Sequence, residues 1–304
     1  MKPPIPFSVW RVLWPVGLGT ALSLIGDTSL YAVLPTHAAD AAVPVAAIGI
    51  LLSANRFIRL ALNGPVGALY DRLPRRRLFV PSLFLGALST AIYALTLGFW
   101  PLLLGRLLWG MAWVGIWVGG NTIILDISHP GNRGQRVGVY QLFFFLGASG
   151  GAVLGGLLTD ILGYHSAMGA GATLTLLGAL VALLFLPETR GLRTATGPHQ
   201  PATSGTDSRS HRGQLASAFG LLGVNRLVMA GILLPTLGLF LSRQFGQSTS
   251  VSGLTVGVAS LTGVALGANG LISMGSTALF GGWSDRANSR WGVAAAGLLP
   301  GFAG

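Results

Sequence analysis

The sequence predicts an all-α membrane protein, a bundle of helices that each cross a lipid bilayer. Hydrophobic residues make up 51% of its 304 residues and charged residues only 9%, and the mean hydropathy is +0.67. A soluble domain is far more polar than this. Apolar runs of about 20 residues, long enough to cross a hydrocarbon core of about 30 Å, recur along the chain between short polar turns.

The first apolar run extends from about residue 13 to residue 34 and follows a short, weakly basic N-terminus. The small residues that come after it, Thr36-His-Ala-Ala, are also compatible with the cleavage site of a signal peptide. The apolar part of a signal peptide is usually about 7 to 15 residues long, which is shorter than this run. We therefore interpret the run as an uncleaved first span.

Five more spans are expected, at about residues 46–70, 78–97, 102–125, 138–158 and 167–186. Residues 1–186 are thus predicted to form an N-terminal six-helix transmembrane bundle. Residues 187–223 are rich in Ser, Thr, Gly, Pro and Arg and predict a cytoplasmic linker.

A second, partial transmembrane bundle is predicted for residues 224–304, with spans at about 226–241 and 256–283. The last apolar piece, from Trp291 to Gly304, is too short to cross a bilayer. The expectation is about eight full spans and part of a ninth, in a C-terminally truncated or fragmentary chain.

The positive charges predict the orientation of the spans. If the N-terminus is cytoplasmic, all nineteen lysines and arginines except Arg56, Arg59, Arg106 and Arg243 fall in cytoplasmic segments or at cytoplasmic span ends. The net charge of +11 is then explained by topology, and no nucleic-acid partner is expected. The chain has no cysteine, and its five histidines lie between apolar runs, so neither a metal site nor a cofactor is expected.

An internal repeat relates the second span to the eighth. The Asn55 to Asp71-Arg72 segment aligns with Asn269 to Asp285-Arg286, and glycines match at both ends of the alignment. A shared intramembrane Asn and a shared Asp-Arg pair at the same separation predict two related bundles in parallel orientation. In transporters of that design the substrate path lies between the bundles.

The motif Gly67-x-x-x-Asp71-Arg72-x-x-Arg75-Arg76 follows the second predicted span. It resembles the motif between the second and third spans of the major facilitator superfamily (MFS), with Pro74 where a second Gly is usual. Arg106-x-x-Trp109-Gly110 resembles the fourth-span motif, and Pro187-Glu188-Thr189-Arg190 resembles the exit from the sixth span.

The fifth span resembles the antiporter motif of the superfamily in its glycine spacing. The matching glycines are Gly147, Gly151, Gly155 and Gly156, and Ala152 replaces the usual proline. The resemblance as a whole implies twelve spans in two bundles, alternating access, and no chemical conversion of the substrate. It also implies a multi-pass protein of the inner or plasma membrane, similar to drug/proton antiporters.

A cytoplasmic gate is expected where the second span ends. Asp71 would pair with arginine and with the N-terminal end of a neighbouring helix until the bundles move. The gating set is Gly67, Asp71, Arg72, Arg75 and Arg76, with Asp285 and Arg286 as the copy in the second bundle. The alternative is that the arginines act only to hold the span ends in the cytoplasm.

A coupling site is expected around Asp27, the acid that lies well inside a span. An intramembrane carboxylate is costly and so suggests a function. Counted along the helices, Asp27 and the pair Asn55 and Arg56 lie at similar depths, roughly 2 to 5 Å outward of the midplane. Arg106 is expected to balance the charge of Asp27. The alternative is a static Asp-Arg pair that only fixes helix packing.

The sequence therefore predicts a secondary transporter, with proton-coupled efflux of a small amphiphilic or drug-like compound as the first hypothesis. The expected partners are the lipid bilayer, a small-molecule substrate and protons. Two alternatives stay open: transport of a sugar or other metabolite on the same fold, and a non-transporting or inactive truncated membrane protein. An enzyme is not expected, because no nucleophile and base set or phosphate-binding loop is present.

Overall fold

The structure is a computed structural model that describes residues 8–95, 98–129, 132–192, 220, 223–224, 227–251 and 254–287. In residues 230, 250, 251, 254 and 277–287 it describes the backbone only. Most of the predicted linker, residues 193–219, and the last apolar piece from Trp291 lie outside the described residues.

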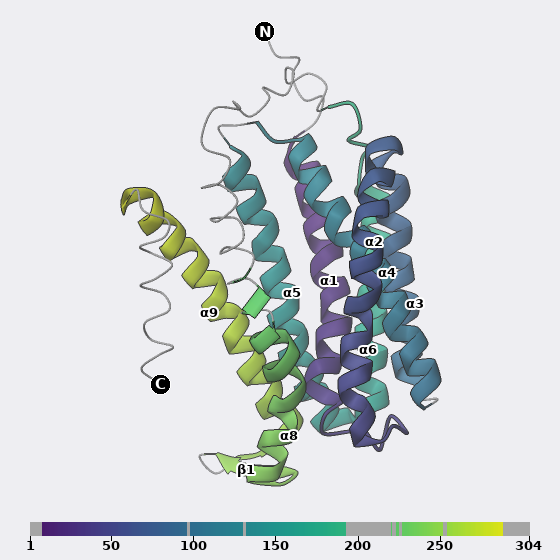
Figure 1. Cartoon of the computed structure of the whole chain (residues 1–304), viewed down its shortest axis with the longest axis vertical. Coiled ribbons are helices and arrows are strands. Elements are labelled where there is room, and N and C mark those ends of the chain that lie inside the picture. Colours follow the sequence, from purple (N-terminus) through teal and green to yellow (C-terminus); the bar gives the residue numbers. More distant parts are fainter. Residues whose placement is uncertain are drawn as a thin grey trace.

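Six long helices form the first bundle (Figure 1). They are α1 (Trp10–Val33), α2 (Ile48–Arg72), α3 (Arg75–Leu95), α4 (Phe99–Asp126), α5 (Arg133–Leu162) and α6 (Tyr164–Phe185), and a short 3₁₀ turn, η1 (Val45–Ala47), leads into α2. Successive helices run in opposite directions, as short connections require. Helix α1 is the most enclosed, because α5 and α6 pack along it and α4 and α3 also reach it.

The chain then continues through a second group of elements. These are a π-helical segment η3 (Leu227–Leu233), α8 (Leu234–Phe245), an antiparallel hairpin of β1 (Ser248–Val251) and β2 (Leu254–Gly257), and α9 (Val258–Ala287). The hairpin differs from the expectation of a span that begins at residue 256. Alternating Ser, Thr and Val residues favour a strand over a helix, and here they lie beside the end of a span, where the backbone need not be helical.

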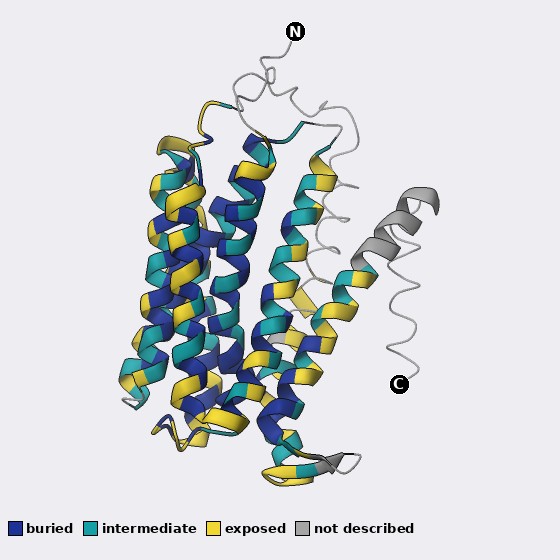
Figure 2. Ribbon diagram, turned by 180° about the vertical axis from the view of Figure 1, so that it is seen from behind, coloured by how far each residue is buried: buried dark blue, intermediate teal, exposed yellow. Residues whose placement is uncertain are grey.

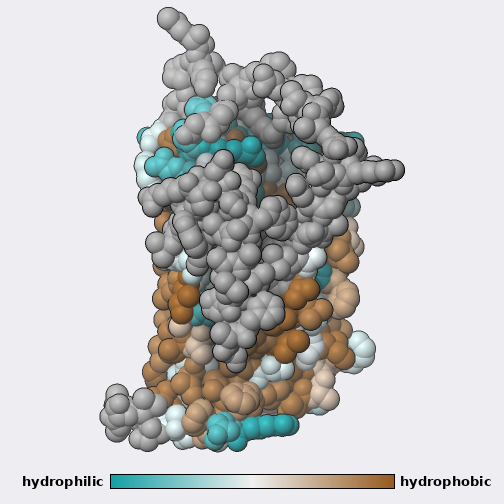
Figure 3. Space-filling model, turned by 60° about the vertical axis from the view of Figure 1, so that its left-hand side comes forward, coloured by the Kyte–Doolittle hydropathy of each residue, from teal (hydrophilic) through white to brown (hydrophobic). Residues whose placement is uncertain are grey.

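The two ends of the bundle differ in chemistry. The arginine end is the one where α2 ends at Arg72 and α3 begins at Arg75, and where α4 and α6 end. The hairpin end carries β1 and β2, the start of α9 and the turn between α5 and α6. Figure 3 shows hydrophilic residues at both ends of the molecule, with the larger group at the arginine end, and hydrophobic residues over the part of the middle that is coloured.

Eight helical segments of the described chain are long and apolar enough to span a membrane. Large apolar side chains face outward from them, such as Leu60 at 82% and Trp100 at 75% exposure, and many of the exposed positions in Figure 2 lie on outward helix faces. Outward apolar side chains are expected when the surrounding solvent is lipid. The prediction of an all-α membrane protein with eight full spans is confirmed, with the short hairpin as its only strands among the described residues.

Helix α5 makes the main contact between the first bundle and α9. The two helices lie close together at the hairpin end and diverge toward the arginine end (Figures 1 and 2). The glycines of α9 show how far the contact reaches. A Cβ at Gly263 would collide with the backbone of Ala152 and one at Gly270 with the side chain of Ser149, whereas a Cβ at Gly275 would lie in open space.

Candidate functional site

A buried ion pair joins α1 and α4 in the interior of the first bundle. The Arg106 Nη1 donates a hydrogen bond to the Oδ1 of Asp27, and the exposed fractions of the two side chains are 0% and 8%. No described residue donates to the other carboxylate oxygen, Oδ2. One carboxylate oxygen of Asp27 is thus bonded to Arg106, and the other, Oδ2, can accept a further hydrogen bond or a proton.

Two tyrosines and the backbone of α2 complete the surroundings of Arg106. The Nη2 donates to the Tyr31 hydroxyl (2.7 Å) and the Nε donates to the carbonyl of Leu51 (3.1 Å). The Nη1 also donates to the hydroxyl of Tyr93 at 3.3 Å, and the guanidinium lies 5.1 Å from the ring centroid of Tyr31. Four helices, α1 to α4, thus converge on one guanidinium group.

The sequence explains part of this geometry. Asp27 and Tyr31 are four residues apart on α1, so both side chains lie on the same helix face. A guanidinium offers five donors in a fixed plane and is suited to such a site. A buried ion pair is no proof of stability, but the loss of one partner typically costs about 3–5 kcal/mol because it leaves a buried charge uncompensated.

Of the other two residues predicted for this site, Asn55 lies beside Tyr31, whereas Arg56 makes no direct bond to Asp27. Asn55 is buried, and its Nδ2 lies 3.5 Å from the Tyr31 hydroxyl, while its Oδ1 has no hydrogen-bond partner. Arg56 is half-buried and forms no ion pair with Asp27. The sequence placed Arg56 at the depth of Asp27 and named Arg106 as the balancing charge, and the structure shows that Arg106 makes the contact.

An aromatic column continues from this site along α4. Trp109 stacks on Trp113 with ring centroids 6.0 Å apart, and Trp113 stacks on Trp117 at 5.7 Å. Phe144 of α5 packs against the last two of these rings. The column fills the space between α4 and α5 with rigid apolar groups.

A second ionic cluster lies at the arginine end. Arg75, at the start of α3, is buried, and its Nε donates to Asp126 at the end of α4 (2.9 Å). The carboxylate of Glu188 accepts bonds from the backbone N–H groups of Arg75 (2.9 Å) and Arg76 (3.1 Å) and so caps the N-terminus of α3. The cluster ties α3, α4 and the exit from α6 together.

The remaining residues of the predicted gate do not join this cluster. Asp71 and Arg72 are exposed, and Asp71 forms no ion pair with any residue that the structure describes. The Cβ position of Gly67 has open space around it. The backbone of Asp285 and Arg286 belongs to α9, and their side chains lie outside the description.

The glycines of the antiporter-like motif lie at two helix contacts of α5. Gly147, Gly151 and Gly155 meet the α1 backbone at Ala21, Ile25 and Ser29, and the Ser29 hydroxyl donates to the carbonyl of Gly151 at 2.9 Å. Gly156 instead meets α9 at Ala259. Small residues at this spacing let backbones approach closely.

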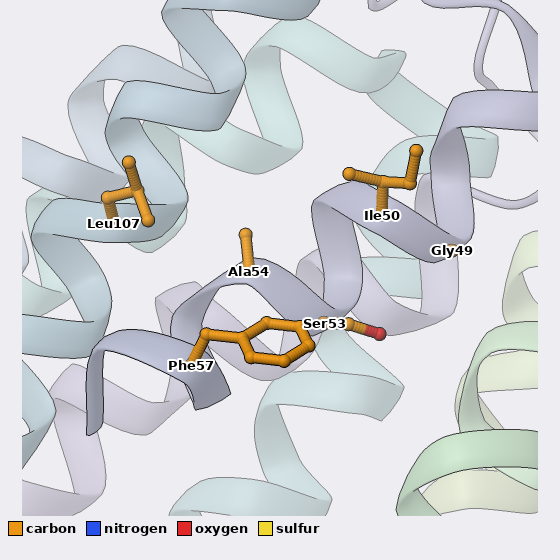
Figure 4. Close-up of a pocket in the computed structure, with 6 residues that line it drawn as sticks. All are labelled: Gly49, Ile50, Ser53, Ala54, Phe57 and Leu107. Carbon is orange, nitrogen blue, oxygen red and sulfur yellow. The ribbon is translucent and has the colours of Figure 1, made fainter. Parts of the chain in front are cut away.

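A shallow depression on the lateral face of the bundle is separate from the ion pair. It lies between α2 and α4 and is lined by Gly49, Ile50, Ser53, Ala54, Phe57 and Leu107 (Figure 4). Ile50 and Phe57 are exposed at 61% and 73%. Apart from Ser53 the lining is apolar, as are the outward faces of the helices in the middle of the bundle.

Comparison with known proteins gives the same family as the motifs. The family model of the Major Facilitator Superfamily matches residues 16–304. The inner membrane transport protein YajR of Escherichia coli (strain K12) is 27% identical over 179 residues, which are 59% of this chain and 39% of that protein. The class C tetracycline resistance protein of Escherichia coli is 31% identical over 140 residues, 46% of this chain and 35% of that protein.

Solved structures share the fold at lower identity. A bacterial homologue of the human lysosomal transporter Spinster superposes with a TM-score of 0.64 at 19% identity, over 92% of this chain and 64% of that one. The human organic anion transporter MFSD10 gives 0.53 at 18% identity, over 91% of this chain and 94% of that one. The chain spans 39% of YajR and 59% of an uncharacterized MFS-type transporter of Yersinia pestis. The family match over nearly the whole chain, together with the eight spans, shows that the protein belongs to the Major Facilitator Superfamily.

Proposed function

We propose that the chain works as a secondary transporter by alternating access and exports a small amphiphilic or drug-like compound in exchange for protons. The observation that carries the proposal is the buried Asp27–Arg106 pair, held by four helices of the first bundle. A charge pair at this depth in a membrane bundle is the expected form of a coupling site.

The chemistry of coupling follows from the free oxygen of Asp27. A proton bound at Oδ2 would neutralise the carboxylate while the guanidinium stays charged. Arg106 would then keep its tyrosine and carbonyl partners but lose its counter-ion. An anionic group or a changed helix packing that brings new acceptors to Arg106 would be needed to restore the balance, which links proton binding to the conformational change that moves substrate.

The arginine end supplies the proposed gate of the cycle. In this arrangement α5 and α9 diverge there, and Asp71 is exposed. The carboxylate of Asp71 can therefore accept hydrogen bonds from a helix N-terminus or from an arginine when that end closes. With the arginine end in the cytoplasm, as the positive-inside rule favours, the end at which α5 and α9 diverge would face inward.

Export is favoured over uptake by the likeness to the tetracycline resistance protein and by the glycine spacing of α5. Everted membrane vesicles test the direction. Addition of tetracycline or ethidium to energised vesicles is expected to cause proton release from their interior and accumulation of the compound. Uptake that runs only into right-side-out vesicles, or transport that moves no protons, would contradict the proposal.

A further inference from the structure

A carboxylate of the first bundle caps the N-terminus of α9 at the hairpin end. Asp160 lies near the end of α5, and its Oδ2 accepts a hydrogen bond of 2.7 Å from the backbone N–H of Ser260. Ser260 is the third residue of α9, and the first turn of α9 contains no acid. The helix thus receives a negative cap from a different bundle.

The start of α9 is shaped for this contact. Gly257, the residue before the helix, has no side chain with which to cap it, and a Cβ there would collide with the carboxylate of Asp160. The backbone N–H of Val258 donates to the carbonyl of Gln247 at 3.1 Å, which fixes the helix start to the other side of the hairpin. The first turn of α9 is therefore held from two sides, by its own hairpin and by α5.

The contact joins parts that must separate in transport. Helices α5 and α9 touch from Asp160 and Gly257 as far as Ser149 and Gly270, and then diverge. An arrangement open at the hairpin end requires these helix ends to move apart. The bond between Asp160 and Ser260 cannot survive that movement.

We propose that Asp160 is a latch: a positioning residue whose carboxylate stabilises the arrangement closed at the hairpin end. The stabilisation comes from a charge-assisted hydrogen bond and from the favourable field of a helix N-terminus on a negative charge. Both are lost when the two helix ends separate, so the latch biases the equilibrium between the two arrangements. This inference rests on the alternating-access proposal above.

Two variants remove the latch in different ways. Asp160→Asn keeps the size of the side chain but removes its charge. Gly257→Ala leaves Asp160 in place, and its methyl group displaces the carboxylate from the N–H of Ser260. Asp40→Asn is the matched control, because Asp40 is an exposed acid at the same end that accepts no hydrogen bond from a described residue.

Pairs of spin labels in lipid nanodiscs report both ends of the molecule. The native chain has no cysteine, so single exposed residues can be replaced without background labelling. Val45→Cys with Gln244→Cys reports the hairpin end, and Gln135→Cys with Ile272→Cys reports the separation of α5 from α9 toward the arginine end. All four positions are exposed.

Asp160→Asn and Gly257→Ala are each expected to raise the ratio of hairpin-open to hairpin-closed molecules roughly three- to tenfold, and Asp40→Asn to leave it unchanged. The distance between the labels at the hairpin end should lengthen, while the distance between the labels at residues 135 and 272 should shorten. Unchanged distance distributions, or a lowered unfolding temperature without a change in the ratio, would overturn the latch. The distances are measured without substrate and so test the latch alone. A chain that fails to transport would instead refute the transport proposal.

Discussion

At the residue scale, Arg106 organises the interior of the first bundle. Its partners come from α1, α2 and α3, and two of them, Tyr31 and Tyr93, were not predicted from the sequence. Helix depth can be counted from a sequence, but the rotation of each helix about its axis cannot, because these spans are apolar on nearly all faces. Depth therefore brought Asp27 level with Asn55 and Arg56. The expectation that Arg106 balances Asp27 came from its match to the fourth-span motif, and the packing brings the two into contact. The signal for Tyr31 was its position four residues after Asp27, on the same face.

Two variants, one at Tyr31 and one at Tyr164, test that organisation directly. Tyr31→Phe removes the hydroxyl that accepts from Arg106 and is expected to lower the free energy of unfolding by about 1.5–3 kcal/mol, since the donor is charged. Tyr164→Phe is the control, because the Tyr164 hydroxyl is buried without a hydrogen-bond partner, and its removal should be neutral or stabilising. Denaturant unfolding in detergent measures both. Equal losses in the two variants would show that the hydroxyl of Tyr31 carries no special role.

At the element scale, α5 makes the most extensive contacts with both α1 and α9. The sequence located its glycines, but it gave no sign that they face two different partners. Nor did it reveal the caps: Glu188 bonds to the N-terminus of α3 more than a hundred residues away, and Asp160 to that of α9. Such bonds use backbone N–H groups, which carry no sequence signal. The hairpin was missed because a short polar segment between two apolar runs is typical of an ordinary loop.

Two neighbouring glycines of α5 are expected to respond in opposite ways to alanine. At Gly151 a Cβ would lie 2.6 Å from the Cα of Ile25, so Gly151→Ala should destabilise the bundle by about 1–3 kcal/mol through overpacking. At Gly150 nothing lies within 4 Å, and Gly150→Ala should stabilise the helix by about 0.5–1 kcal/mol. Thermal unfolding of the two variants side by side decides this, and a gain at both positions would contradict the close approach of α1.

At the scale of the whole molecule, the order and number of spans followed well from the sequence. Length and hydropathy fix these features, because a span must be about 20 apolar residues long. The span ends were less accurate: α5 begins at Arg133, five residues earlier than predicted, since charged residues at a membrane surface can still be helical. The divergence of α5 from α9 depends on contacts between distant helices and could not be predicted.

The orientation of the bundle is tested by labelling from one side of the membrane. With the arginine end in the cytoplasm, a membrane-impermeant maleimide added to intact cells should label Val45→Cys and leave Gln135→Cys unlabelled. Everted vesicles should give the reverse pattern. The absence of native cysteine removes the background, and labelling of Gln135→Cys in sealed intact cells would mean that the topology is inverted.

The central claim is that Asp27 couples protons to substrate movement, and the most direct measurement compares two modes of transport in the same proteoliposomes. Transport driven by a pH gradient needs proton binding, whereas counterflow of labelled substrate against unlabelled substrate does not. Asp27→Asn is expected to abolish gradient-driven accumulation of tetracycline or ethidium while counterflow continues. Full gradient-driven accumulation by Asp27→Asn would contradict the account.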